Sequence, residues 1–256
     1  MSSHEPALLE KTGGVATLTL NRPDKLNAMG STMRAAIDRH LQAVTADAGI
    51  RVLLIRAKGR AFCAGADMDD LPGDPLIWRE RILLAQRHHR MLATMNAIVV
   101  AAVQGKAVGG GASMALAADI LLMADDASLS FPFVRIGLVP DGGASMLLQA
   151  KLGTAAALDL LLTGGAIGAD EASRRGLSRR VVPAAELGAH AQALADELLR
   201  LPAEALLLTK SLARQTWTPP MQAALAHEAD AFALATALPG YATALAKMLA
   251  QRKEKR

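Results

Sequence analysis

The chain has 256 residues, of which 52% are hydrophobic, 20% charged and only 3% aromatic. This length suits one large domain, or one domain with a small appendage, with a core of alanine, leucine and valine. The formal net charge of +4 is mild, and no basic patch interleaved with aromatic side chains is present, which argues against nucleic-acid binding.

Cysteine usage and the chain's start bear on the compartment. Cys63 is the single cysteine, so no disulfide can form within the chain, as expected in a reducing compartment. The first residues lack a basic segment followed by an apolar one, so they do not resemble a signal peptide. No apolar run approaches the length of a membrane span. We therefore expect a cytoplasmic protein with no membrane partner.

The first half of the chain alternates extended and helical segments. The expected strands are residues 15–20, 51–57, 97–103, 119–125 and 127–131. The expected helices are residues 32–47, 75–95, a short one after three consecutive glycines, and 142–153. Ser31 is the expected N-cap of the first helix, and Pro75 lies near the start of the second. A long loop rich in glycine and aspartate covers residues 58–74.

From Thr154 onward the sequence is mostly helical. The expected helices are residues 154–165, 168–176, 185–201, 202–215, 220–238 and 241–256, and residues 177–183 form a brief extended piece. The pattern predicts an α/β body, in which two extended pieces and a helix recur, followed by a helical tail.

The three glycines, Gly109 to Gly111, separate a strand pattern from a helix pattern. They do not complete the dinucleotide-binding G-x-G-x-x-G, the phosphate-binding loop or the G-x-S-x-G nucleophile turn. A helix that begins at glycines exposes backbone N–H groups to an approaching anionic oxygen. A second glycine loop, "FCAGADM", also follows an apolar strand. The two loops could each direct one N–H at the same oxygen, as in an oxyanion hole, or could be tight turns only.

Four stretches, "LNRPDKLNAM", "AFCAGADM", the run from Val103 to Gly143 and the helical tail, occur in the order and at the spacing of one known superfamily. From about Val15 to its end, the chain resembles the crotonase, or enoyl-CoA hydratase/isomerase, superfamily. The resemblance implies a crotonase-like α/β spiral of ββα units with a C-terminal helical trimerisation region. Residues 1–200 would form the core with the CoA and acyl site, and residues 201–256 the oligomerisation region and a lid over the site.

The resemblance also implies a ligand and an assembly. The substrate would be a CoA thioester, so CoA would enter as part of the substrate, with no separate cofactor and no metal. The protein would form a homotrimer or a hexamer of two trimers. The thioester oxygen would lie between the N–H groups of Ala66 and Gly110. The expected substrate-binding residues are Lys25, Leu26, Ala28, Ala64, Asp67, Met68, Val108, Ser113 and Phe133.

The type of reaction depends on three positions. Hydratases of the superfamily use two glutamates, and here the matching positions hold Ser113 and Phe133, neither of which can act as a base. Asp141 in "LVPDGG" stands where several isomerases carry an acid, among them Δ3-Δ2-enoyl-CoA isomerases and epoxyphenylacetyl-CoA isomerases. The resemblance favours an acyl-CoA isomerase with Asp141 as its single base.

Several alternatives remain open at the level of sequence. Asp141 could instead cap the helix that follows it, since aspartate is a good N-cap. The protein could be an enoyl-CoA hydratase of fatty-acid or aromatic-acid degradation with an unidentified acid. It could use Asp141 as a nucleophile, as aromatic acyl-CoA dehalogenases do, or bind CoA thioesters without catalysis.

Other polar residues have simpler interpretations. Cys63 is expected to be a small buried side chain, and His88 and His89 to lie on a solvated helix face. Asp67 is expected to brace its loop rather than bind a cation, and Asp70 is a second candidate acid. Lys25 could meet a CoA phosphate or be a solvated turn residue. Met248 and Gln251 replace the phenylalanine and lysine that often reach CoA from the last helix, and Arg252 or Lys253 would have to substitute.

Overall fold

The computed structural model describes residues 5–178, 180–215 and 218–254. The strands are β1 (Ala7–Thr12), β2 (Val15–Leu20), β3 (Val52–Ala57), β4 (Ile98–Val103), β5 (Lys106–Val108), β6 (Ile120–Ala124), β7 (Ser128–Ser130), β8 (Ala166–Gly168) and β9 (Arg180–Val182). The α-helices are α1 (Ser31–Thr45), α2 (Pro75–Thr94), α3 (Gly110–Ala117), α4 (Ala144–Leu152), α5 (Thr154–Thr163), α6 (Ala169–Arg174), α7 (Leu187–Arg200), α8 (Ala203–Arg214), α9 (Thr218–Ala237) and α10 (Pro239–Glu254).

A largely parallel sheet lies at the centre of the molecule. Among the described residues, its strand order is β1-β2-β3-β4-β6-β9, and only the β1–β2 pair is antiparallel. Val52 of β3 pairs with Val15 of β2 on one side and with Ile98 of β4 on the other. All of β4 is buried, because helices cover both faces of a parallel sheet, and its sequence is therefore a continuous apolar run.

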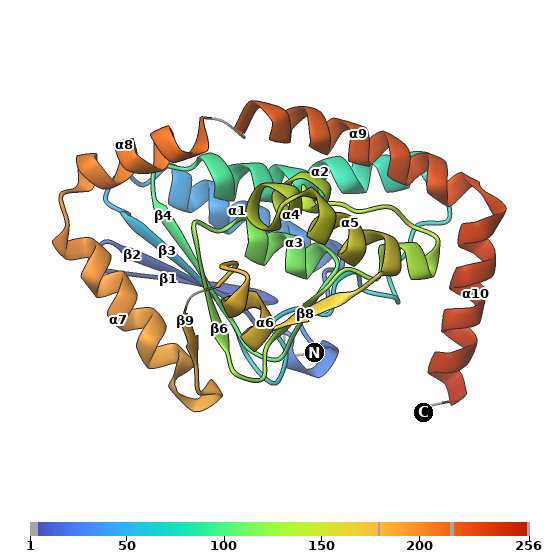
Figure 1. The fold of residues 1–256 in the computed structure, drawn as a ribbon, viewed down its shortest axis with the longest axis horizontal. Helices are drawn as coiled ribbons and strands as arrows, with labels where there is room; N and C mark the ends of the chain where they lie inside the picture. Colours follow the sequence, from blue (N-terminus) through green and yellow to red (C-terminus); the bar gives the residue numbers. More distant parts are fainter. Residues whose placement is uncertain (1–4, 179, 216–217, 255–256) are drawn as a thin grey trace.

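Helices enclose this sheet, and a small second sheet, β5-β7-β8, lies beside it. Helix α7 packs on β3, β4 and β6, whereas α1 packs on β1 and β2. Helix α2 lies between α1, α3 and α9. Figure 1 shows α8, α9 and α10 as an arch over the body, with α9 running along α2 and α10 descending to the C-terminus.

Three loops meet at one edge of the sheet, beyond the carboxyl ends of β2, β3 and β4. The Ala64 N–H donates to the carbonyl of Leu26 (2.9 Å), and the Met29 N–H donates to Gly65 (2.7 Å). The Val108 N–H donates to the carbonyl of Cys63 (2.8 Å). These bonds join the loops into one unit at the place where open α/β sheets usually bind ligands.

Most of the expected elements are confirmed, with ends that shift by a few residues. The prediction that Ser31 caps α1 is wrong, because Gly30 is the N-cap and the Ser31 N–H donates instead to Asp70 (2.5 Å). The sequence analysis missed β1, β5 and β8, which are short or carry polar side chains at half of their positions. The division into residues 1–200 and 201–256 stays a prediction.

The length and composition of the helices bear on whether any of them could span a membrane. No single helix in the described ranges is both long and apolar enough to cross a bilayer. Helices α9 and α10 reach that length and composition only as a pair, and the chain bends by 76° between them.

Candidate active site

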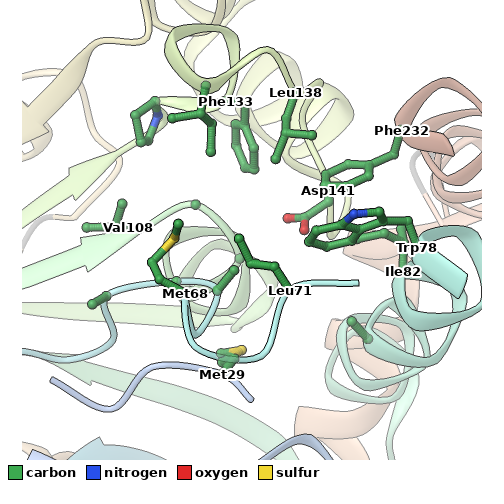
Figure 2. Close-up of a pocket in the computed structure, with 18 of the residues that line it drawn as sticks. Met29, Met68, Leu71, Trp78, Ile82, Val108, Phe133, Leu138, Asp141 and Phe232 are labelled. Carbon is green, nitrogen blue, oxygen red and sulfur yellow. The ribbon is translucent and has the colours of Figure 1, made fainter. Parts of the chain in front are cut away.

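A cavity of about 240 Å³ opens where the three loops meet, and it extends under α2, α9 and α10. Its walls are mainly apolar, and Figure 2 shows the labelled side chains gathered around it. The large apolar lining residues are Met29, Met68, Leu71, Trp78, Ile82, Val108, Phe133, Ile136, Leu138, Phe232, Leu245 and Met248. Such a cavity suits an apolar group with a few polar contacts at defined points.

Asp141 is the only carboxylate among the described lining residues. Its carboxylate points into the cavity among apolar side chains (Figure 2), and its Oδ1 is buried without a hydrogen-bond donor in the described part of the chain. Burial raises the pKa of Asp141, and the nearby His89 and Arg34 offset only part of this rise. The carboxylate is therefore a stronger base than an aspartate in water.

The alternative that Asp141 caps α4 through its side chain is wrong. Gly143 is the N-cap, and Asp141 contributes only its carbonyl, which accepts from the Ala144 N–H (3.1 Å). Glu228 of α9 does the capping instead, since it accepts from the N–H groups of Gly143 (2.8 Å) and Ser145 (3.1 Å). The Asp141 carboxylate is thus left free for the cavity.

The glycine loops bring two unused N–H groups to the same cavity. Ala66 and Gly110 both line it, and within the described residues neither backbone N–H has an acceptor. A Cβ on Gly65 would lie 2.8 Å from the Val108 carbonyl oxygen, and one on Gly111 would lie 2.6 Å from the Cys63 Cβ. Glycine at these two positions therefore allows the two loops to lie against each other.

Gly110 lies next to the Asp141 carboxylate. A Cβ there would lie 3.6 Å from Asp141 Oδ1, an ordinary van der Waals contact. Gly110 and the free carboxylate therefore face each other across the cavity wall.

The predicted substrate-binding residues divide into two groups. Ala64, Met68, Val108 and Phe133 line the cavity, together with Ala66, Gly110 and Asp141. The remaining predicted residues do not line it: these are Lys25, Leu26, Ala28, Asp67 and Ser113.

The residues outside the cavity have other contacts. Lys25 forms an ion pair with Asp69 (2.8 Å) near the surface. Asp67 pairs with Arg22 (2.9 Å) and also accepts from a backbone N–H two residues on, as expected of a loop brace. Ser113 is fully buried and its hydroxyl donates to the Asp141 carbonyl (2.8 Å). Ser113 therefore supports the Asp141 turn and does not line the cavity.

The expectation that His88 and His89 lie on a solvated face is wrong. Both are almost fully buried, because His88 lies against Asp38 of α1 and His89 lies against Gly110 at the start of α3. His89 lines the cavity, and burial lowers its pKa against the attraction of Asp141. His88 Nε2 lies 3.3 Å from Asp38 Oδ1, and burial lowers the pKa of His88 to about 4. No local pattern indicates this burial, because it results from the packing of α2 on α1 and α3.

Cys63 and Asp70 lie close to the cavity loops but do not line the cavity. Cys63 is fully buried as expected, and burial raises the pKa of its thiol to about 12. Asp70 does not line the cavity and is not a free acid. Burial opposes its ionisation, but bonds from Ser31 and Arg81 outweigh this and lower the pKa of Asp70.

The C-terminal helices contribute residues to the cavity wall, and only Met248 among them was singled out from the sequence. Phe232 of α9 and Tyr241, Leu245 and Met248 of α10 line the cavity, whereas Gln251 is exposed. The side chains of Arg252 and Lys253 lie outside the described part of the chain. Arg34, which also lines the cavity, was missed because a single arginine on a helix carries no sequence signal. In the described ranges, no group of three His, Cys, Asp or Glu side chains could hold a metal ion.

The chain's relationship to known proteins agrees with this geometry. The sequence profile of the family described as enoyl-CoA hydratase/isomerase matches residues 10–243. The chain belongs to this family of CoA-thioester enzymes. Its fold agrees: the crystal structure of an enoyl-CoA hydratase from Mycobacterium avium subsp. paratuberculosis superposes with a TM-score of 0.88 at 31% identity, covering 96% of this chain and 100% of that one. The predicted crotonase-like fold is thus confirmed.

The relatives of this family member carry two kinds of name. A 1,2-epoxyphenylacetyl-CoA isomerase from Escherichia coli is 36% identical over 244 residues, covering 93% of each chain. A probable enoyl-CoA hydratase from Rhodobacter capsulatus is 34% identical over 230 residues, covering 89% of this chain and 88% of the relative. Sequence similarity therefore does not decide between isomerisation and hydration, and the distinction depends on the residues of the site.

Proposed function

We propose that the protein is an acyl-CoA isomerase that shifts a double bond in a CoA thioester, with Asp141 as its single base. The observation that carries this proposal is the free, buried Asp141 carboxylate, the only one among the described residues of the cavity wall. An allylic shift needs one group that removes a proton and returns it two carbons away. CoA takes part as a portion of the substrate and not as a separate cofactor.

The two unused N–H groups stabilise the charge that develops during the reaction. The thioester oxygen of a 3-enoyl-CoA binds between Ala66 and Gly110, whose N–H groups have no other acceptor. Removal of a proton from the α carbon moves negative charge onto this oxygen as the dienolate forms. Donors fixed in place before the reaction are worth most in such a dry site, and the loss of one typically lowers kcat 10²- to 10³-fold.

Asp141 handles the proton. Its carboxylate takes the α proton, becomes neutral, and then returns the proton to the γ carbon, so that the double bond moves into conjugation with the thioester. The apolar side chains around it, such as Phe133 and Leu138, exclude water and raise its pKa. Because the turn is held by Ser113 and Glu228 through other atoms, the carboxylate is free for both transfers.

The hydratase alternative is less well supported by the cavity. The two positions that hold glutamates in hydratases are Ser113, which faces away, and Phe133, which makes that wall apolar. His89 is the one histidine among the described residues of the cavity wall, and burial lowers its pKa. A hydratase here would have to activate water with Asp141 alone.

The test compares a 3-enoyl-CoA with a 2-enoyl-CoA as substrates of purified protein. The wild type is expected to conjugate the 3-enoyl-CoA, and Asp141→Asn to lose this activity by a factor of roughly 10² to 10⁴. When the wild type converts unlabelled 3-enoyl-CoA in D2O, part of the α hydrogen should appear at the γ carbon of the product, because one acid performs both steps.

Asp159→Asn is the matched control, since Asp159 is exposed on α5 and is not one of the residues that line the cavity. Hydration of the 2-enoyl-CoA by wild type and Asp141→Asn at equal rates would contradict the proposal. A stable mass increase on Asp141 after turnover would instead indicate the nucleophile mechanism, and binding of both thioesters without turnover would indicate a binding protein.

A further inference from the structure

Arg34 of α1 is a buried cation without a hydrogen-bond partner at the cavity wall. Arg34 is only 6% exposed, and both Nε and Nη1 are buried with no acceptor among the described residues. Arg34 is one of the residues that line the same cavity as Asp141. Arginines in protein interiors are normally paired, so two unmet donors at a binding site call for an explanation.

The carboxylates that could pair with Arg34 are already used. Asp38, one helical turn further along α1, is bound by Arg87 (2.8 Å from its Oδ1) and lies 3.3 Å from His88. Asp70 accepts from Arg81 (3.0 Å) and from the Ser31 N–H. These acids attract Arg34 at most from a distance, and they cannot satisfy its donors.

Asp141 does not satisfy Arg34 either. The two side chains interact electrostatically, but no hydrogen bond or ion pair joins them, and Asp141 Oδ1 is itself without a donor. The cavity therefore presents a free acceptor and a free cationic donor to its contents. An unsubstituted alkyl acyl group would present its acidic α C–H to the Asp141 carboxylate. It would leave the Arg34 guanidinium buried and unpaired.

We propose that Arg34 selects acyl groups that carry a hydrogen-bond-accepting oxygen beyond the α carbon. This inference rests on the proposed function only in taking the cavity as the acyl site. The bound oxygen is either a neutral one, such as a ketone, or a carboxylate, and both fit the fork of guanidinium donors. An alkyl acyl group of the same length is selected against, because it desolvates the cation without pairing it.

The test measures binding of three saturated thioesters of equal chain length by calorimetry: pentanoyl-CoA, 4-oxopentanoyl-CoA and glutaryl-CoA. The wild type is expected to bind at least one of the two oxygen-bearing thioesters about tenfold more tightly than pentanoyl-CoA. A preference for 4-oxopentanoyl-CoA assigns the neutral oxygen, and a preference for glutaryl-CoA assigns the carboxylate. In Arg34→Met the preference should fall to nearly one, while pentanoyl-CoA binds at least as well as before.

Arg34→Lys is the second variant, because it keeps the charge but loses the fork of donors, and melting curves of both variants establish that they fold. Equal affinity of the wild type for all three thioesters would overturn the inference. So would an equal loss of all three affinities in Arg34→Met, which is the result expected if Arg34 only balances the charge of Asp141.

The two proposals fail separately in this design. None of the three thioesters has a carbon–carbon double bond, so their ranking does not depend on the reaction. If the three thioesters bind in the expected order of affinity but a 3-enoyl-CoA is not turned over, only the isomerase proposal is contradicted. Turnover of a 3-enoyl-CoA without any ranking would remove the Arg34 inference alone.

Discussion

Gly110 and Gly111 are adjacent glycines that the structure uses for different purposes. Gly111 packs against Cys63, so that any side chain there would overlap the neighbouring loop. Gly110 faces the cavity, where a methyl group would fit beside Asp141 Oδ1 at 3.6 Å. One residue thus allows the loops to approach each other, and the other keeps the site open.

This difference predicts opposite results for two alanine substitutions. Gly111→Ala should lower the free energy of unfolding by about 1–3 kcal/mol, because overpacking forces the loops apart. Gly110→Ala should keep the melting temperature, since alanine favours a helix start over glycine, but should lower kcat/KM roughly 10- to 100-fold by covering the donor. Thermal melts and steady-state kinetics separate the two effects. Equal loss of stability in both variants would refute the assignment.

At the scale of the element, the first turn of α4 is held by a residue from a distant part of the chain. Glu228 of α9 accepts from the N–H groups of Gly143 and Ser145 and from the Ser145 hydroxyl (2.5 Å). Burial raises the pKa of Glu228 to about 7, although these bonds oppose the rise. The carboxyl is therefore protonated in the folded protein over a pH range in which it is ionised in the unfolded chain.

The pH dependence of stability follows from this shift. Because the folded state holds the proton between the ordinary glutamate pKa of 4.5 and about 7, the contribution of Glu228 is present below that window and is lost as pH rises through it. The rise of the Glu228 pKa from 4.5 to about 7 corresponds to a loss of unfolding free energy of roughly 3 kcal/mol at most. Glu228→Gln, whose side chain cannot ionise, should flatten the unfolding free energy across this range.

The measurement is urea unfolding at several pH values between 4.5 and 8. Glu204→Gln is the control, since Glu204 is exposed on α8, and its curve should run parallel to the wild type. A Glu228→Gln curve that also runs parallel would contradict the assignment of the titrating group.

The elements show what local sequence can and cannot predict. Strands β2, β3 and β4 were recognised because a buried parallel strand needs a short apolar run, and the glycine loops that follow were visible for the same local reason. Strand β1 was missed because its outer half is exposed and polar. His89 and Glu228 could not be placed, since their environments are created by the packing of α2 on α3 and of α9 on α4, which no local pattern encodes.

At the scale of the whole molecule, the outer helices expose apolar side chains. Leu208 and Leu212 lie one turn apart on α8, and each is 65% exposed. Leu158 and Leu162 on α5 form a similar exposed pair. Neighbouring apolar side chains on a surface mark sites of association, and the family resemblance leads us to expect a trimer or a hexamer.

We expect the purified protein to elute as a trimer or hexamer in light scattering coupled to size exclusion. The double substitution Leu208→Glu with Leu212→Glu should shift it to smaller species if α8 lies in an interface, because buried charges would be left unpaired. Thr209→Glu is the control for added charge on the same exposed helix. A wild-type monomer would refute the expected assembly.

The arch of α8, α9 and α10 also sets the order in which the enzyme becomes competent during synthesis (Figure 1). Both donor loops and Asp141 leave the ribosome early, yet the turn that holds Asp141 is capped by Glu228, and the cavity is closed by Phe232 and Tyr241. A nascent chain that ends before α9 would have the groups proposed for catalysis but neither the cap nor the roof. The cavity therefore obtains both its cap and its roof only when the last helices have been made.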